Sequence, residues 1–306
     1  MPVSEYALVL SVTMGLAVAG VAWYCLQVTR QITYVTLADG RRQARSLPLL
    51  FRLFLPLAPN ITPLFKRPAF QGIRVRTQRR IVAAGYDTLL TGEELLALRV
   101  LFAVILGGLW CFAVIGAFER APFAFLKSLV PFLCVLGPVL LAVWPGAWLK
   151  RVLQQRHTSI RRALPFVLDL LTLSVEAGMD FMSALQRSVD VRPIDALGEE
   201  LIRVVREIQL GRVRREALRD MSVRVNLAEL RSVVNALVQA DELGVSIGAI
   251  LRIQSNQMRQ RRFEYAERLA NEAPVKMLFP LMAFIFPAVF LVLLGPIAVD
   301  LARQAF

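Results

Sequence analysis

Apolar runs of membrane-spanning length lie on both sides of a central stretch, residues 150–276, that contains no such run. They cover residues 6–26, 95–118, 123–149 and 277–299. About 20 consecutive apolar residues cross a bilayer as a helix, and a helix satisfies its own backbone polar groups there. Hydrophobic residues make up 56% of the 306, and the mean hydropathy is +0.55. The sequence therefore predicts an all-α membrane protein with about four transmembrane helices.

The segment at 6–26 is expected to remain in the protein as the first transmembrane helix, within residues 1–28. A cleaved signal peptide is the competing interpretation, but such peptides begin with basic residues, and here Glu5 precedes the apolar run. Residues 27–94 then carry 11 Lys and Arg against 4 Asp and Glu. Basic loops stay on the cytoplasmic side of the membrane, so residues 29–94 are predicted to be a basic cytoplasmic loop.

Two parts of this loop are predicted to lie at the membrane surface. Residues 47–70 are apolar but are interrupted by Pro48, Pro56, Pro59, Pro63 and Arg52, which leaves no helix long enough to cross. An interfacial segment fits this pattern, and an ordinary loop with a few buried leucines stays open as the alternative. Residues 72–94 are expected to form a short basic helix facing the headgroups, with Arg74, Arg76, Arg79 and Arg80.

Residues 95–149 are predicted to form a transmembrane hairpin, because only a short turn at 119–122 separates their two apolar runs. Three prolines spaced seven residues apart should bend the second arm: Pro131, Pro138 and Pro145. The last span lies within residues 277–306. Four spans place both termini on the same side, so the basic loop and the central stretch are predicted to be cytoplasmic and the termini periplasmic.

The central stretch repeats one pattern at intervals of 33 residues. Gly178, Gly211 and Gly244 each follow a periodic helical segment, and an apolar pair comes six and seven residues after each glycine. Glycine just beyond a helix, followed by a new helix, indicates a helical corner. Three corners predict an antiparallel bundle of about six helices over residues 150–276.

Helix boundaries in the bundle follow from capping residues. Asp180 and Asp195 are expected N-caps, and Ser246 is expected to cap the last helix. Asn226 with Glu229 resembles a capping box. Pro274 is expected to end the last helix just before the membrane.

The first helix of the bundle carries an apolar stripe with a polar face beside it. Leu164, Val167, Leu168, Leu171 and Val175 form the stripe, whereas Asp169, Thr172 and Glu176 share the other face. Asp169 and Glu176 are about 10 Å apart at 1.5 Å per residue. Acid–base chemistry, a partner-facing acidic patch and a solvated face all stay open for them. In the next helix, Glu199, Arg203 and Glu207 have the spacing of an exposed row of ion pairs.

No motif for catalysis, metal binding or cofactor binding is present. There is no phosphate-binding loop, no nucleophile elbow and no zinc-protease motif, and the single histidine, His157, cannot anchor a metal cluster. The cysteines Cys25, Cys111 and Cys134 lie in apolar runs, so no disulfide framework is expected. Charges near mid-membrane are sparse, which counts against a transporter. Basic residues beside spans indicate anionic lipid instead of nucleic acid.

The charged residues beside the corners are the candidates for a protein partner. This set consists of Asp169, Glu176, Gly178, Asp180, Glu207, Gly211, Arg212, Asp241, Glu242 and Gly244. A docking partner is expected to touch the corners before the helix flanks. The candidates for contact with the membrane surface are Arg74, Arg76, Arg79, Arg80, Arg259, Arg261, Arg262 and Lys276.

Several segments of the chain resemble a known family. They are Leu164-Pro-Phe-Val-Leu-Asp-Leu-Leu, Glu176-Ala-Gly, Glu207-Ile-Gln-Leu-Gly, Gln239-Ala-Asp-Glu-Leu-Gly and Val275-Lys-Met-Leu-Phe-Pro. Residues 160–299 resemble the type II secretion F-domain family, and specifically the TadC-type platform proteins of the tight-adherence (Flp) pilus machinery. Residues 1–150 are similar only in the arrangement of their spans.

The resemblance implies a non-enzymatic platform in the bacterial inner membrane. Such a protein would act with a TadB-type paralogue and a cytoplasmic secretion ATPase to move pilin into a filament, with no cofactor. Platforms of general type II secretion and of type IV pili carry two copies of the helical domain, whereas this chain has one clear copy. One copy favours the tight-adherence system and a homo- or hetero-oligomer. A general secretion or type IV pilus platform, and then a membrane transporter, are the alternatives.

Overall fold

The computed structural model describes residues 34–36, 42–44, 47–65, 67–119 and 124–305. The all-α class is confirmed, since most of these residues are helical and their strands form only one short antiparallel pair, β1 (Tyr34–Thr36) and β2 (Arg42–Ala44). Three helices of the described part have the length and composition of membrane spans: Gly92–Gly116, Val130–Glu176 and Ile247–Ile297. The predicted span at 6–26 lies outside the described residues.

Residues 47–119 fold into a series of helices. They are α2 (Leu49–Phe54), η1 (Leu55–Asn60), α3 (Thr62–Phe65), η2 (Pro68–Phe70), α4 (Gln71–Ala84), α5 (Gly92–Leu101), the π-helical η3 (Phe102–Leu106) and α6 (Gly107–Glu119). The prolines between 48 and 68 explain why the first four helices are short, because each proline removes one helical hydrogen bond. Phe51 is fully buried between Phe102, Trp144 and Trp148. The apolar part of the predicted loop thus packs around Phe51 against the membrane hairpin.

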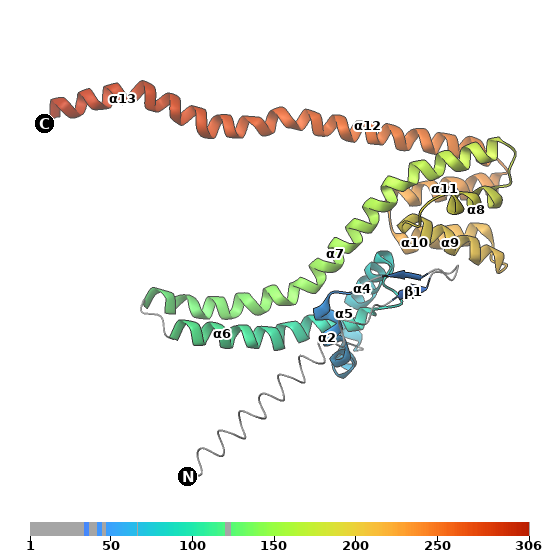
Figure 1. The fold of residues 1–306 in the computed structure, drawn as a ribbon, viewed down its shortest axis with the longest axis horizontal. Helices are drawn as coiled ribbons and strands as arrows, with labels where there is room; N and C mark the ends of the chain where they lie inside the picture. Colours follow the sequence, from blue (N-terminus) through green and yellow to red (C-terminus); the bar gives the residue numbers. More distant parts are fainter. Residues whose placement is uncertain (1–33, 37–41, 45–46, 66, 120–123, 306) are drawn as a thin grey trace, which may run out of the picture.

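α7 (Ala124–Glu176) is one helix of 53 residues that forms the second arm of the hairpin and also the first helix of the bundle. At 1.5 Å per residue it is about 80 Å long. It curves along its length (Figure 1), and Pro131, Pro138 and Pro145 lie in its membrane half. The helix passes residue 150 without a break.

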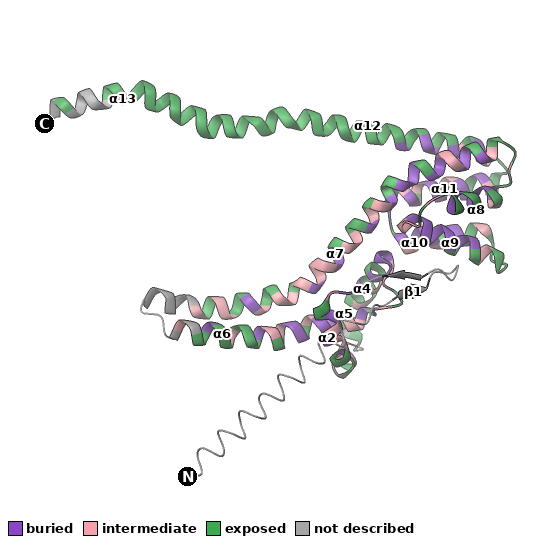
Figure 2. Ribbon diagram, viewed as in Figure 1, coloured by how far each residue is buried: buried purple, intermediate pink, exposed green. Residues whose placement is uncertain are grey.

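α12 (Ile247–Pro280) continues in the same way through the π-helical η4 (Leu281–Ile285) into α13 (Phe286–Ala305). Pro274 lies inside α12, so the prediction that it ends this helix is wrong. One proline removes a single hydrogen bond, and the apolar residues beyond it must stay helical to satisfy their backbone in a membrane. From Arg259 to Leu294 every residue is exposed (Figure 2).

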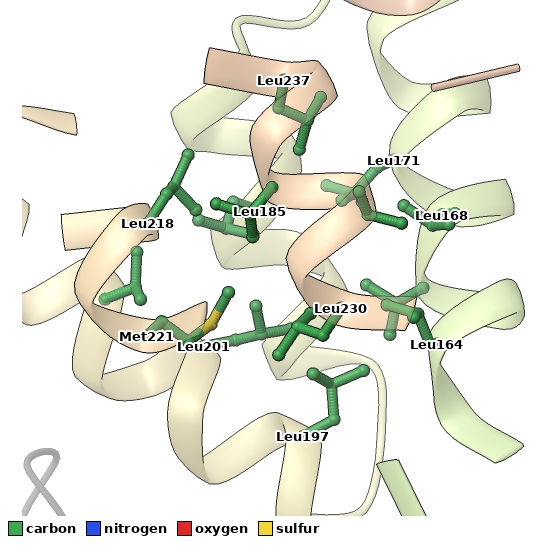
Figure 3. Packing of buried hydrophobic residues seen from close by; sticks show 14 of the residues in the cluster. Leu164, Leu168, Leu171, Leu185, Leu197, Leu201, Leu218, Met221, Leu230 and Leu237 are labelled. Atoms are coloured by element: carbon green, nitrogen blue, oxygen red, sulfur yellow. The ribbon is translucent and has the colours of Figure 1, made fainter. Parts of the chain in front are cut away.

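The bundle consists of six helices, as predicted. The end of α7 packs with α8 (Phe181–Asp190), α9 (Ala196–Gln209), α10 (Arg214–Val225), α11 (Ala228–Leu243) and the start of α12. Leucines from five of these helices interlock in its core (Figure 3). Leu164, Val167, Leu168 and Leu171 are buried, which confirms most of the predicted stripe, and Val175 is half-buried against the same core.

Candidate interaction site

Each of the three repeated glycines ends a helix in the left-handed conformation, as the 33-residue pattern predicts. Gly178, Gly211 and Gly244 have φ of +88°, +94° and +69°. The N–H of the residue after each glycine donates to the carbonyl five residues before it; Met179 donates to Ser174 in this way at 3.0 Å. This is the Schellman bond, and it caps carbonyls that the helix leaves without partners. The repeat therefore encodes three equivalent helix ends.

The three corners lie together at one end of the bundle. Arg214, which follows the second corner, pairs with Asp241 beside the third, and its guanidinium lies 5.3 Å from the ring centre of Phe181 beside the first. Gly248, at the start of α12, lies against Val175, at the end of α7. We call this end of the bundle, formed by residues 175–181, 207–215 and 241–248, the tip.

The tip is the end of the bundle farthest from the candidate membrane spans. α7 arrives from the membrane hairpin and ends at the tip, and α12 begins there and runs toward the last span (Figure 1). A partner that approaches the bundle from the side away from the membrane therefore meets the tip first.

Two leucines at the tip are almost fully exposed. Leu210 and Leu243 each come directly before a corner glycine and are 78% and 77% exposed. Val213 and Val245, on the other side of the same glycines, are exposed as well. Exposed aliphatic side chains that gather on one surface mark interaction sites. Sequence reasoning missed these residues because a leucine in a periodic helix is read as core, although the 33-residue repeat places both at the same position.

Residues close to these apolar side chains in the sequence form ion pairs. Arg212 pairs with Glu207 at 2.9 Å and with Asp220, and Arg219 pairs with Glu242 at 2.8 Å. Desolvation lowers the pKa of Arg212, but the charges and hydrogen bonds of Asp220 and Glu207 outweigh it, so the pKa is raised. Exposed pairs of this kind contribute little stability. Exposed apolar side chains accompanied by charged ones are the usual composition of a protein interface.

A chain of ion pairs leads from the tip into the bundle. Glu207 accepts from Arg224 at 3.1 Å, and Arg224 reaches Glu200 at 3.3 Å. Arg156 of α7 completes the chain with contacts of 2.9 Å to Glu200 and 2.8 Å to Glu199. We call this set the ion-pair chain.

The position of Glu199 corrects a prediction. Only the pair of Arg203 with Glu207, at 3.3 Å, matches the expected exposed row. Glu199 is buried, because Arg156 draws its carboxylate toward α7. A helical spacing alone does not reveal a cation on another helix.

The three residues of the predicted polar face of α7 lie in different surroundings. Asp169 accepts from Arg259 at 2.6 Å and from Ser255, whereas Glu176 lies 3.7 Å from Arg252. Thr172 is buried, and its hydroxyl donates to the carbonyl of Leu168 at 2.7 Å. Both carboxylates therefore contact α12.

Asp169 has a shifted pKa. Partial burial raises the pKa of its carboxyl, but the hydrogen bonds from Ser255 and Arg259 and the charge of Arg259 outweigh burial, so the pKa is lowered. A carboxyl held in its ionised form by an arginine is a poor proton donor. This environment fits a structural contact between α7 and α12 in the bundle.

The predicted caps differ in outcome. Asp180 and Asp195 are N-caps that accept from the N–H groups of Met182 and Gly198 at 2.9 and 2.7 Å. Ser246 stands at the N-cap of α12 but its side chain makes no capping hydrogen bond. The capping box at Asn226 is wrong: Asn226 ends α10 in the left-handed region, with φ of +52°, and Leu227 begins α11. Asparagine tolerates the left-handed conformation, so Asn226 forms the C-cap of α10.

The membrane-surface candidates fall into two groups. Arg76, Arg79 and Arg80 are exposed on α4, whereas Arg74 pairs with Glu93 at 3.0 Å. On α12, Arg261 is exposed, Arg259 binds Asp169, and Arg262 donates to the carbonyl of Arg162 at 2.7 Å. Lys276 pairs with Glu272 at 3.0 Å. Arg76, Arg79 and Arg80 on α4 are therefore exposed and have no carboxylate partner among the described residues.

Within the described residues no group of His, Cys, Asp and Glu side chains could hold a metal ion. His157 lies instead with Nε2 at 2.9 Å from the carbonyl oxygen of Val225, where it joins α7 to the end of α10.

Comparison with known proteins finds one family that is similar to most of the bundle and to the last span. Residues 167–295 match the family model described as type II secretion system (T2SS), protein F. No curated protein and no solved structure matches the chain. The matched range begins in the bundle part of α7 and ends in α13, so it covers the tip, the ion-pair chain and the last span. Proteins of this family are non-enzymatic membrane platforms of secretion and pilus systems, which work with secretion ATPases and pilins. Residues 167–295 are thus similar to a type II secretion system protein F domain, in a chain with three candidate membrane spans among its described residues.

Proposed function

We propose that this protein is an inner-membrane assembly platform of a tight-adherence (Flp) pilus system, which couples a cytoplasmic secretion ATPase to the extrusion of pilin. The observation that carries the proposal is the tip, where three helix corners gather around exposed Leu210 and Leu243 at the end of the bundle farthest from the spans. The tip would receive the ATPase.

The proposed topology places the bundle in the cytoplasm and both termini in the periplasm. Its support is the basic excess of residues 27–94 together with the parity of four spans. Lys150 and Arg151, at the point where the apolar part of α7 ends, add to the same bias.

The mechanism proposed for coupling uses two unbroken helices. α7 and α12 both run from the tip into candidate membrane spans, and Asp169 with Arg259 joins them within the bundle. A helix transmits displacement along its axis because every turn is hydrogen-bonded to the next. A push on the tip would therefore tilt both helices and shift their membrane ends against pilin.

The assignment to the tight-adherence system rests on the resemblance and on the number of F domains. The family match covers a single domain, and described residues 47–106 pack as short helices around Phe51. A TadB-type paralogue would supply the second domain. The exposed face of α12 and α13 would be available to that partner or to pilin.

The experiment replaces the tip leucines with a charged residue. Leu210→Asp with Leu243→Asp places two charges in the apolar centre of the tip, and we expect loss of surface filaments and of ATPase co-purification. Val191→Asp with Val223→Asp is the matched control, because both valines are exposed at the opposite end of the bundle. Normal filaments and normal ATPase recovery from the tip variant, at wild-type protein levels, would refute the proposal. If the tip variant loses the secretion of enzymes and not surface filaments, the protein belongs to a general secretion system.

A further inference from the structure

A group of arginines on α4 and α5 has no carboxylate partner among the described residues. Its members are Arg76, Arg79, Arg80 and Arg99. The nearby carboxylates are engaged elsewhere: Glu93 pairs with Arg74 at 3.0 Å, Glu94 forms a capping box with Thr91, and Asp87 lies 3.7 Å from Arg203. The surface formed by α4 and α5 therefore carries positive charge that the described protein does not neutralise.

Arg99 is the most confined of these arginines. It lies on α5 within the candidate span Gly92–Gly116 and reaches across to α7, where a Cβ built on Gly146 would lie 2.5 Å from its Nη2. Its Nε is buried and has no hydrogen-bond partner in the described structure. Arg80 lies on α4, which packs against α5.

The residues around Arg99 indicate its depth in the membrane. Trp144 and Trp148 flank Gly146 on α7, and tryptophans are enriched where a membrane meets water. Lys150 follows directly after. Arg99 therefore lies at the depth of the lipid headgroups on the side of the membrane that carries the bundle.

Arginines that have no carboxylate partner beside a membrane attract anionic headgroups. We propose that Arg99 and Arg80 bind the phosphate of an anionic phospholipid between α4, α5 and α7. The guanidinium group of Arg99 would donate to the phosphate from the notch at Gly146, and Arg80 would contribute from the headgroup side. Basic pockets between helices at this leaflet are suited to anionic headgroups.

The apolar surface next to the pocket favours a lipid over a soluble phosphate. Val104, one turn beyond Val100 on the membrane side of Arg99, is exposed, and so is Val143, one turn from Gly146 on α7. Acyl chains attached to the bound headgroup would cover these side chains. Inorganic phosphate would leave them uncovered.

Native mass spectrometry of the full chain tests the site. The protein, released from membranes in mild detergent, is titrated with phosphatidylglycerol and, separately, with phosphatidylcholine. We expect preferential retention of phosphatidylglycerol, weakened about tenfold in Arg99→Gln and in Arg80→Gln, because each loses a charge-assisted hydrogen bond. Arg187→Gln removes the same charge from an exposed position on α8 and should retain phosphatidylglycerol as the wild type does.

A second variant separates charge from position. Gly146→Ala keeps every arginine but pushes the Arg99 guanidinium out of its notch, so it should also weaken retention of phosphatidylglycerol. Equal retention by the wild type, Arg99→Gln, Arg80→Gln and Gly146→Ala would overturn the site. Displacement of phosphatidylglycerol by millimolar inorganic phosphate would overturn its assignment to a lipid and assign it to a soluble anion.

Discussion

Gly178, Gly211 and Gly244 define the tip because each lets a helix end in a conformation that other residues avoid. Leu210 and Leu243 are exposed as a consequence, since the chain turns directly after them. At this scale the sequence allowed prediction of the corners and of the caps at Asp180 and Asp195. It did not allow prediction of Arg156 with Glu199, because that pair joins residues 43 positions apart.

Replacement of a corner glycine is expected to destabilise the bundle through its backbone alone. No atom lies within 4 Å of a Cβ built at Gly211, but a non-glycine residue in the left-handed region costs about 1–2 kcal/mol. Gly211→Ala should therefore lower the thermal midpoint of the detergent-solubilised protein, and Gly211→Asn should lower it less. Gly248→Ala is the control, because this helical glycine has space for a methyl group; an equal loss in the control would contradict the argument.

Removal of Arg156 should be more damaging than removal of the whole buried cluster. Arg156→Met removes the cation that contacts both buried Glu199 and Glu200, although Arg224 still reaches Glu200, and this loss costs about 3–5 kcal/mol. The triple variant Arg156→Met, Glu199→Gln, Glu200→Gln should recover part of that loss in denaturant unfolding. A triple variant less stable than Arg156→Met would contradict this account.

Asp169 should make the stability of the bundle depend on pH. Its pKa is lower in the folded protein than in the unfolded chain, so its contribution is present above about pH 4 and is lost as pH falls through the folded-state pKa. The difference in thermal midpoint between the wild type and Asp169→Asn should therefore shrink from pH 6 to pH 3. A difference that stays constant over this range would show that ionised Asp169 contributes nothing.

At the scale of elements, the continuity of α7 and α12 was the feature that the sequence did not reveal. Changes in hydropathy near residues 150 and 276 mark the passage from water to membrane, but the backbone hydrogen-bonding pattern is the same on both sides. The prediction that Pro274 ends α12 is wrong for the same reason, because the change in hydropathy near Pro274 is not a break in the helix. The six helices of the bundle were predictable, because their apolar stripes have the helical period.

Interruption of α12 is expected to abolish filament assembly without unfolding the bundle. A Gly-Ser-Gly insertion after Glu267 lies where the helix is exposed and beyond its last buried residue, Met258. The bundle should remain folded and keep its ATPase partner, whereas filament assembly should fail because displacement no longer reaches the membrane. The same insertion after Pro193, in the connection between α8 and α9, should leave assembly intact; normal assembly with both insertions would exclude α12 as the transmitting element.

At the scale of the whole molecule, one bundle lies at the ends of two long helices, α7 and α12, which continue into candidate membrane spans (Figure 1). The sequence predicted the spans and the bundle from hydropathy. The gathering of three corners at one end could not be predicted, because it depends on how α7, α10 and α11 pack against one another. Because the three corners pack together, the repeated glycines and their neighbours form one surface, the tip.

The central claim is that the tip receives the secretion ATPase, and site-specific photo-crosslinking in the native host tests it most directly. A photoreactive residue in place of Leu243 should capture the ATPase, identified by mass spectrometry, whereas the same residue in place of exposed Val223 at the opposite end of the bundle should not. Capture of the ATPase at Val223 but not at Leu243 would contradict the account.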